Sequence, residues 1–127
     1  MSEQLPPDFS GGRNIAMKVP PHQWEATVAF YRDIVGLPTF AHEPTEPPSV
    51  GFVFGGNRLW IDRVESVSHA ELWLELTTPD VPAAAEHLRA AGVVRRDEIE
   101  PLPDDHEGFW IANPAGIIHM VAKPDTP

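Results

Sequence analysis

The order of hydrophobic and polar residues along the chain predicts two helices and several strands. Strict alternation predicts strands, and an apolar residue at every third or fourth position predicts helices. The helices are expected within residues 22–38 and 81–93, where Gly36 and Gly92 end them and Asp80 caps the second. The strands and hairpins are expected at residues 13–20, 50–64, 70–80, 93–102 and 108–124.

These elements form an internal repeat. Residues 13–66 read as strand, helix and strands, and residues 70–123 repeat that order. Two copies of one unit favour a pseudo-twofold arrangement, with a concave sheet face shared between them and the helices on the convex face. We therefore expect a single domain over residues 1–127, in which residues 1–12 are a polar N-terminal arm.

The strand expected at residues 70–80 has two dissimilar faces. Leu72, Leu74 and Leu76 lie on one side, which we assign to the buried face under the helices. Glu71, Trp73 and Glu75 lie on the other side, toward the concave face. A tryptophan between two carboxylates is unusual for a surface that is only exposed to solvent. The concave face is therefore the candidate binding site.

Composition narrows the possible partners. The formal net charge is −10 and the pI is about 4.8, which disfavours nucleic acid and anionic membranes. The chain has no cysteine, which excludes disulfides and thiolate metal sites, and no apolar run long enough for a membrane helix. The N-terminus lacks the pattern of a signal peptide, so we expect a cytoplasmic protein.

Three segments resemble one known family. VAFYRDIVGLP, TPDVPAAAEHLRAAGV and NPAGIIHMV are similar, in this order, to the first helix, second helix and last turn of the vicinal oxygen chelate superfamily. This superfamily contains glyoxalases, bleomycin-resistance proteins and extradiol dioxygenases. The resemblance covers about residues 13–123. It implies an α+β fold of two βαβββ modules, 13–66 and 70–123, that form a curved, partly open mixed sheet with a concave cup, and it implies a homodimer.

The resemblance also says where a metal would bind. In the family's enzymes, two histidines on the first strands and two glutamates on the last strands hold a divalent ion. The corresponding positions here are Asn14, Trp73, Trp60 and Met120. Because these side chains are poor ligands for such an ion, we expect neither a metal site of the family type nor another cofactor.

The sequence therefore favours a metal-independent protein that binds a small molecule, as bleomycin-resistance proteins do. Two tryptophans could hold a cationic or aromatic antibiotic or metabolite, with nearby acids supplying the counter-charge. Alternatively, Lys18 and Arg58 could neutralise these acids, and Arg58 could attract a carboxylate instead. The residues predicted to line the site are Asn14, Arg58, Trp60, Asp62, Glu71, Trp73, Glu75 and Met120.

Other interpretations remain open. The chain could be an enzyme of the same superfamily, either metal-dependent or using Glu71 or Glu75 as a general base, and the sequence does not identify catalytic residues. The tryptophans could also simply fill the cup. His42 and His69 could reach its mouth from strand ends, whereas His119 is expected on the helix side. Trp24 and Tyr31 are expected to pack in the core or a dimer interface.

Overall fold

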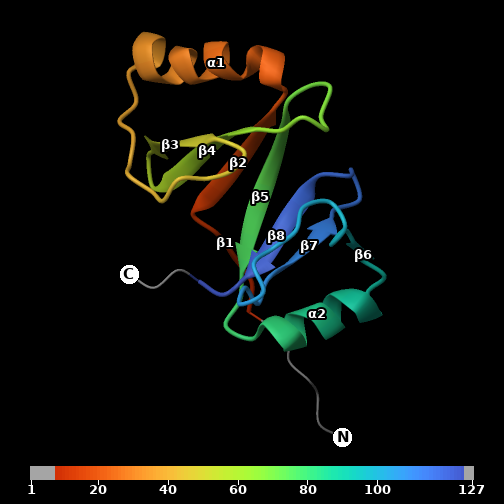
Figure 1. The fold of residues 1–127 in the computed structure, drawn as a ribbon. Helices are drawn as coiled ribbons and strands as arrows, with labels where there is room; N and C mark the ends of the chain where they lie inside the picture. Colours follow the sequence, from red (N-terminus) through yellow and green to blue (C-terminus); the bar gives the residue numbers. More distant parts are fainter. Residues whose placement is uncertain (1–7, 125–127) are drawn as a thin grey trace, which may run out of the picture. The chain divides into compact units, whose positions relative to one another are not determined.

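The computed structural model describes residues 8–124 (Figure 1). The first seven residues of the predicted N-terminal arm lie outside this range. The described chain separates into two compact units, Arg13–Trp73 (the N-terminal unit) and residues 8–12 with 74–124 (the C-terminal unit). The boundary falls inside one strand, β5 (Glu71–Thr77), which contributes its first residues to one unit and its last residues to the other.

The sheet of the N-terminal unit is built on a parallel pair of strands. β2 (Asn14–Val19) runs parallel to β4 (Asn57–Arg63), with Ala16 opposite Trp60. β3 (Ser49–Phe54) pairs antiparallel with β4 through the predicted hairpin, where Gly55 has a φ of 63°. The first residues of β5 pair antiparallel with the other edge of β2, which places Trp73 opposite Ala16.

One helical segment covers a single face of this sheet. α1 (Pro21–Ala29) begins at a proline and continues as a π-helix, η1 (Phe30–Val35), which ends at Gly36 with a φ of 79°. The sequence predicted the segment and its end but not the change of helix type. Trp24 and Tyr31 pack against the core, as predicted, and the Trp24 indole N–H donates to the Ile61 carbonyl oxygen at 2.9 Å. The buried core consists of Val19, Val28, Phe52, Leu59 and Ile61.

The C-terminal unit repeats this plan. The last residues of β5 run parallel to β8 (Ile118–Ala122) and antiparallel to β1 (Ser10–Gly11). β7 (Phe109–Ala112) lies antiparallel between β8 and the short β6 (Val94–Arg95). In α2 (Val81–Ala90), the Asp80 side chain accepts from the Ala83 N–H at 3.1 Å, which confirms the predicted cap. The core is Val81, Ala84, Phe109, Ile111 and Val121.

The fold class is confirmed. Within residues 8–124, eight strands pair in the order β3-β4-β2-β5-β8-β7-β6, with β1 also beside β5, and the sheet is mixed and open. In both repeats the first strand runs parallel to the last. Within these residues, no helix combines the length and the apolar character that crossing a bilayer requires. The prediction that the chain forms a single domain remains a prediction.

Three sequence-based expectations were wrong. The strand expected at residues 93–102 is only two residues long, because the Asp97 carboxylate takes the Trp110 backbone N–H at 3.0 Å and ends the ladder. Ser10–Gly11, predicted as part of the polar N-terminal arm with no regular structure assigned to it, is a strand. Leu72 and Leu74 are 48% and 39% exposed, because neither core cluster extends over the middle of β5.

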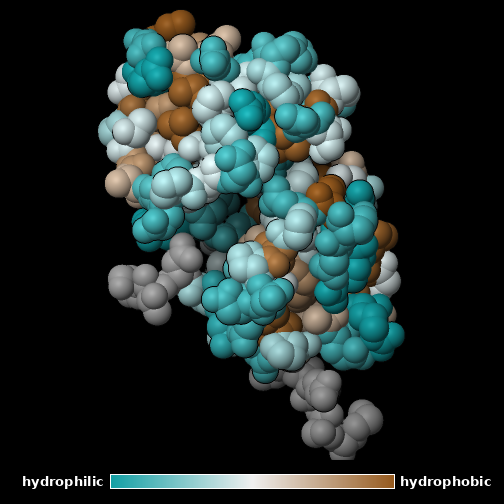
Figure 2. Space-filling view, in the orientation of Figure 1, coloured by the Kyte–Doolittle hydropathy of each residue, from teal (hydrophilic) through white to brown (hydrophobic). Residues whose placement is uncertain are grey.

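The exposed apolar side chains are distributed over both units. Figure 2 shows hydrophobic atoms as separate patches among hydrophilic ones. On η1, Ile34 is the most exposed at 77%. Such scattered exposure is normal for a protein surface and does not by itself mark a site.

Candidate functional site

Six of the eight predicted site residues lie on one face of the N-terminal unit, on the side of the sheet away from α1. The strand register arranges them in three rows across β4, β2 and β5. The middle row holds Trp60, Ala16 and Trp73. The second row holds the charged groups Asp62, Lys18 and Glu71, and the third pairs Arg58 with Asn14. We call this surface, together with Phe40, His42 and Ser49, the aromatic face.

Trp60 is the centre of the aromatic face. Its indole N–H donates to the side-chain oxygen of Asn14 at 2.9 Å. The rings of Phe40 and His42 meet it edge to face, with centroids 5.0 and 4.9 Å away. Phe40 fits there because Gly51 lies beneath it; a Cβ atom at Gly51 would clash with the Phe40 ring. Trp60 remains only partly buried, so part of its indole is accessible.

Lys18 lies against the ring of Trp73, the second tryptophan of the aromatic face. Its ammonium group lies 2.7 Å from an Asp62 oxygen and 4.3 Å from the centroid of the Trp73 ring. The Ser49 hydroxyl donates to the second Asp62 oxygen. Lys18 and Trp73 are buried, at 3% and 4% exposure. The protein's own cation therefore neutralises Asp62 and lies against the Trp73 ring, where a cationic ligand was expected.

Two charged groups of the aromatic face remain outside this pair. The Arg58 guanidinium lies 5.4 Å from the centroid of the Phe40 ring. It forms no ion pair with any residue between 8 and 124. Glu71 is exposed to solvent at the start of β5. The accessible part of the face therefore combines one guanidinium and three aromatic rings with the carboxylate of Glu71.

The other two predicted residues, Glu75 and Met120, belong to the C-terminal unit. They are direct register partners on β5 and β8, and both are partly buried. Gly12 donates its backbone N–H to the Glu75 carbonyl at 2.8 Å, and a Cβ atom on Gly12 would clash with the Glu75 carboxylate. Glu75 therefore lies against a backbone that has no side chain at this point.

The histidines and Trp110 also have defined places. His42 reaches Trp60, as the sequence allowed, whereas His69 is exposed and contacts only its neighbour Ser68 among the contacts described. His119 alternates with Met120 and so shares the face of the core residue Val121, the predicted helix side. Trp110 is buried, and its indole donates to the Glu100 carbonyl at 2.9 Å.

The four family positions do not fit a metal ion. Asn14 offers an amide oxygen that already accepts from Trp60, indole rings do not coordinate divalent ions, and Met120 offers only a thioether. Within the described part of the chain, no three His, Asp or Glu side chains lie close enough to share an ion. The donor set thus differs from that of a metal-binding family member.

Sequence reasoning missed Phe40 and Ser49. Phe40 follows the helix in a segment without regular spacing, so no periodicity could place it on Trp60. Ser49 alternates with Gly51 and Val53 on β3, and its register partner is Asp62. Its position depends on the hairpin turning at Gly55 and Gly56, which pairs Gly51 with Trp60. The glycine-rich turn left this register open in the sequence, and the two pairings it suggested for Trp60, with Val53 or with Phe52, were both wrong.

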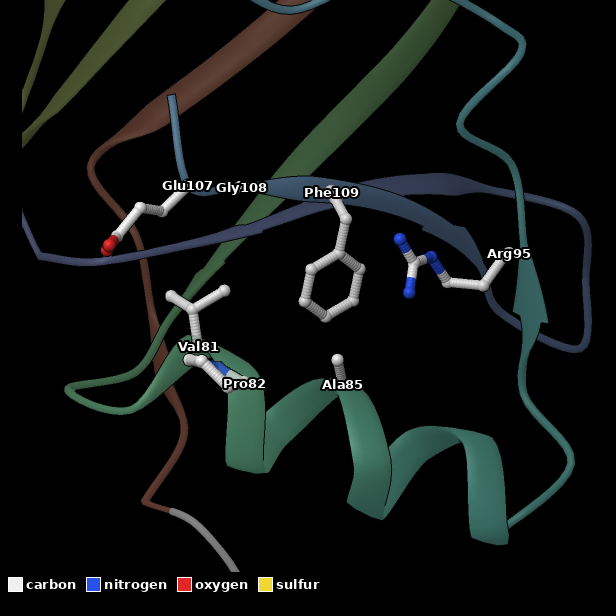
Figure 3. A pocket seen from close by; sticks show the side chains of 7 residues that line it. All are labelled: Val81, Pro82, Ala85, Arg95, Glu107, Gly108 and Phe109. Atoms are coloured by element: carbon white, nitrogen blue, oxygen red, sulfur yellow. The ribbon is translucent and has the colours of Figure 1, made fainter. Parts of the chain in front are cut away.

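A second concavity lies on the helix side of the C-terminal unit (Figure 3). It is a shallow pocket of about 290 Å³ between α2 and β7. Phe109 points toward Ala85 of α2, and Arg95 and Glu107 stand at opposite ends. Both charges already have partners: Arg95 pairs with Asp97 at 2.5 Å and Glu107 with Lys123 at 2.9 Å. This pocket has an apolar floor and no unpaired charge among its lining residues.

Comparison with known proteins identifies the family. A family model described as a glyoxalase-like domain matches residues 16–120 of the chain. A comparison with curated protein sequences finds no match. The matched segment spans most of both repeats and contains all of the predicted site residues except Asn14.

Solved structures share the fold at low sequence identity. A hypothetical protein from Bacillus halodurans C-125 superimposes with a TM-score of 0.67 at 11% identity, covering 94% of this chain and 96% of its own. A methylmalonyl-CoA epimerase in complex with methylmalonyl-CoA and NH4+ gives 0.66 at 18% identity, with 94% and 97% coverage. An Mn(II)-bound glyoxalase from Novosphingobium aromaticivorans gives 0.58 at 19%, covering 91% of this chain and 41% of that protein.

Proposed function

The chain belongs to the glyoxalase-like domain family, and we propose that it binds a small aromatic molecule on the aromatic face without a metal ion. The observation that carries the proposal is the hydrogen bond between Trp60 and Asn14. These residues occupy two positions at which the family resemblance expects metal ligands. The Asn14 amide stands where the family's enzymes have an imidazole, and the Trp60 indole stands where they have a carboxylate. The two positions therefore offer a ring for stacking instead of ligands for a metal ion.

The surroundings of Trp60 support a role in binding. Phe40 and His42 fix the ring edge to face, and the hydrogen bond to Asn14 fixes its rotation. A ring held in this way loses little conformational entropy when a ligand stacks on it. Because Trp60 is only partly buried, stacking would also remove apolar surface from water.

The remaining predicted residues have narrower proposed roles. Lys18 already contacts both Trp73 and Asp62. We therefore assign these two residues a structural role in the aromatic face and no direct contact with the ligand. Glu71 is the exposed acid that would favour a cationic ligand of the bleomycin-resistance type. Glu75 and Met120, a homodimer and a cytoplasmic location stay predictions.

A second candidate function is metal-free acid–base catalysis. Structural neighbours of the chain include a protein named an epimerase, although at 18% identity this likeness concerns the fold alone. Glu75 is the better placed of the two predicted bases, because it is partly buried against Gly12 whereas Glu71 is exposed. A pH–rate profile that loses its acidic limb, the fall in rate at low pH, in Glu75→Gln would favour this candidate.

The test of the proposed function begins with metal content by native mass spectrometry and elemental analysis. Calorimetric titration with the neutral probe 2-naphthamide then measures stacking. We expect no stoichiometric metal, measurable binding, and at least a tenfold loss of affinity in Trp60→Ala. The control is Phe54→Ala, which removes a 45%-exposed ring elsewhere in the same unit and should leave affinity unchanged.

The contrary results are equally definite. Unchanged affinity in Trp60→Ala would exclude the aromatic face as the binding surface. One metal ion per chain would show that ligands come from other positions and would favour the enzyme.

A further inference from the structure

Arg58 is the cation of the aromatic face that has no carboxylate partner among the described residues. Six arginine and lysine side chains form ion pairs within residues 8–124: Lys18, Arg32, Arg89, Arg95, Arg96 and Lys123. Arg13, Arg58 and Arg63 form none within these residues, and of the three Arg58 is the one on the aromatic face, where it is partly buried on β4. Its described side-chain contact is with the Phe40 ring. A partly desolvated guanidinium without a carboxylate is suited to accept one from a ligand.

The acids of the aromatic face do not compete for this role. Asp62 is bonded to the Lys18 ammonium and to the Ser49 hydroxyl. It lies four residues along β4 from Arg58, about 13 Å at the usual strand rise. Glu71 is a register partner of Lys18, two rows from Arg58. The end of the face that carries Arg58 is therefore locally positive, although the whole chain is acidic.

The aromatic rings continue from this positive end. Arg58 lies over Phe40, Phe40 contacts Trp60, and Trp60 contacts His42. Side chains two residues apart on β4, such as Arg58 and Trp60, point to the same side of the sheet at a spacing of about 6.6 Å. That spacing suits a flat ring on Trp60 whose carboxylate meets the guanidinium fork.

From this arrangement we propose that the ligand of the aromatic face is a planar aromatic carboxylate, held by Arg58 through its charge and by Trp60 through its ring. The inference rests on the proposed function, since it assumes that Trp60 binds an aromatic group. It replaces the cation expected from sequence with an anion, because Lys18 already supplies the cation for Asp62 and Trp73. Long-range repulsion from the net charge of −10 is largely screened at physiological salt.

Three probes of one shape test the inference. 2-Naphthoate, 2-naphthamide and 2-naphthamidine carry the same ring with an anionic, neutral or cationic planar group. In calorimetric titrations at pH 7 and 0.15 M salt, we expect the wild-type protein to bind naphthoate at least tenfold tighter than naphthamide, and naphthamidine weakest. Arg58→Gln should abolish the preference for naphthoate over naphthamide.

Two control variants complete the design. Arg32→Gln makes the same change of net charge at an exposed η1 residue that pairs with Asp33, and it should preserve the naphthoate preference. Arg58→Lys keeps the charge but not the bidentate fork, so an intermediate preference is expected. Thermal melting of each variant verifies that it is folded.

The outcomes separate the two proposals. Tightest binding of naphthamidine, or equal binding of all three probes, would overturn the carboxylate inference and leave aromatic binding intact. An unchanged naphthoate preference in Arg58→Gln would overturn it as well. Failure of the wild-type protein to bind any of the three would refute both proposals.

Discussion

The two units share a backbone plan and differ in the chemistry placed on it. In each, the first strand runs parallel to the last, and the helical segment between them ends at a glycine with a φ near +80°. Yet Asn14 and Trp60 of the N-terminal unit correspond to Trp73 and Met120 in the second repeat. The register has been kept while the side chains have diverged, which shows why a family fold does not determine a family's chemistry.

The units also differ in which face carries the candidate features. The N-terminal unit gathers aromatic and charged groups on the side of the sheet away from its helix. The C-terminal unit has its pocket on the helix side, between α2 and β7, and the pocket's charges are paired and exposed. A buried ion pair in one unit and surface pairs in the other should respond very differently to mutation.

We expect the largest effect at the Lys18–Asp62 pair. Asp62→Ala should destabilise the protein by about 2–4 kcal/mol, because it leaves a buried ammonium without its carboxylate. Lys18→Met should cost less, since it removes the buried charge itself. Glu107→Ala, which breaks an exposed pair of the C-terminal unit, should change stability by less than about 1 kcal/mol. Urea unfolding measures all three, and similar losses in Asp62→Ala and Glu107→Ala would refute the distinction.

The next effect concerns the leucines of β5. Leu76 packs against the core of the C-terminal unit, and Leu76→Ala should cost about 2 kcal/mol. Leu72→Ala, at a residue that is 48% exposed, should change stability by less than about 0.5 kcal/mol. The same unfolding experiment compares them. A loss above about 1 kcal/mol in Leu72→Ala that depends on protein concentration would instead show that a second copy covers this residue.

A smaller and equal effect is expected at the two glycines that end the helical segments. Gly36→Ala and Gly92→Ala should each cost about 1 kcal/mol, because both positions have positive φ and a new Cβ atom would meet no neighbour. Gly56→Ala is the control, since that glycine has open space and no positive φ; it should be neutral or slightly stabilising. Clearly unequal losses at Gly36 and Gly92 would argue against equivalent helix ends.

The sequence predicted the repeat well because both of its signals are local. Alternation identified the strands, and Gly36, Gly92 and Asp80 identified the helix ends, each through the conformation or hydrogen bond that the residue itself provides. The exposure of Leu72 and Leu74 could not be predicted in this way. Alternation shows that they share a face, but only the extent of the helices shows whether that part of the face is covered.

The candidate site was predicted in outline. Strand parity placed six residues on one face of the N-terminal unit, and the register confirms that they share it. Parity could not show that Lys18 would bond to Asp62 and lie on Trp73, because that depends on distances between strands far apart in sequence. This contact changes the expected charge of the ligand from positive to negative. The charge of the ligand therefore depended on a contact between strands that the sequence could not predict.

The smallest expected difference lies in surface carboxylates of the two helical segments. Arg32 lowers the pKa of Asp33 on η1 by donating hydrogen bonds to it, and Arg89 lowers that of Glu86 on α2 in the same way. A carboxyl whose pKa is lower in the folded state stabilises the protein above its unfolded-state pKa, and this stabilisation is lost as the pH falls through the folded-state pKa. Carboxyl ¹³C titrations should show both pKa values rising in Arg32→Gln and Arg89→Gln respectively. Because both carboxylates are exposed, added salt should weaken the two pKa shifts to a similar extent. A pKa shift that persists at high salt in one unit alone would show that the carboxylate of that unit is buried and would contradict this expectation.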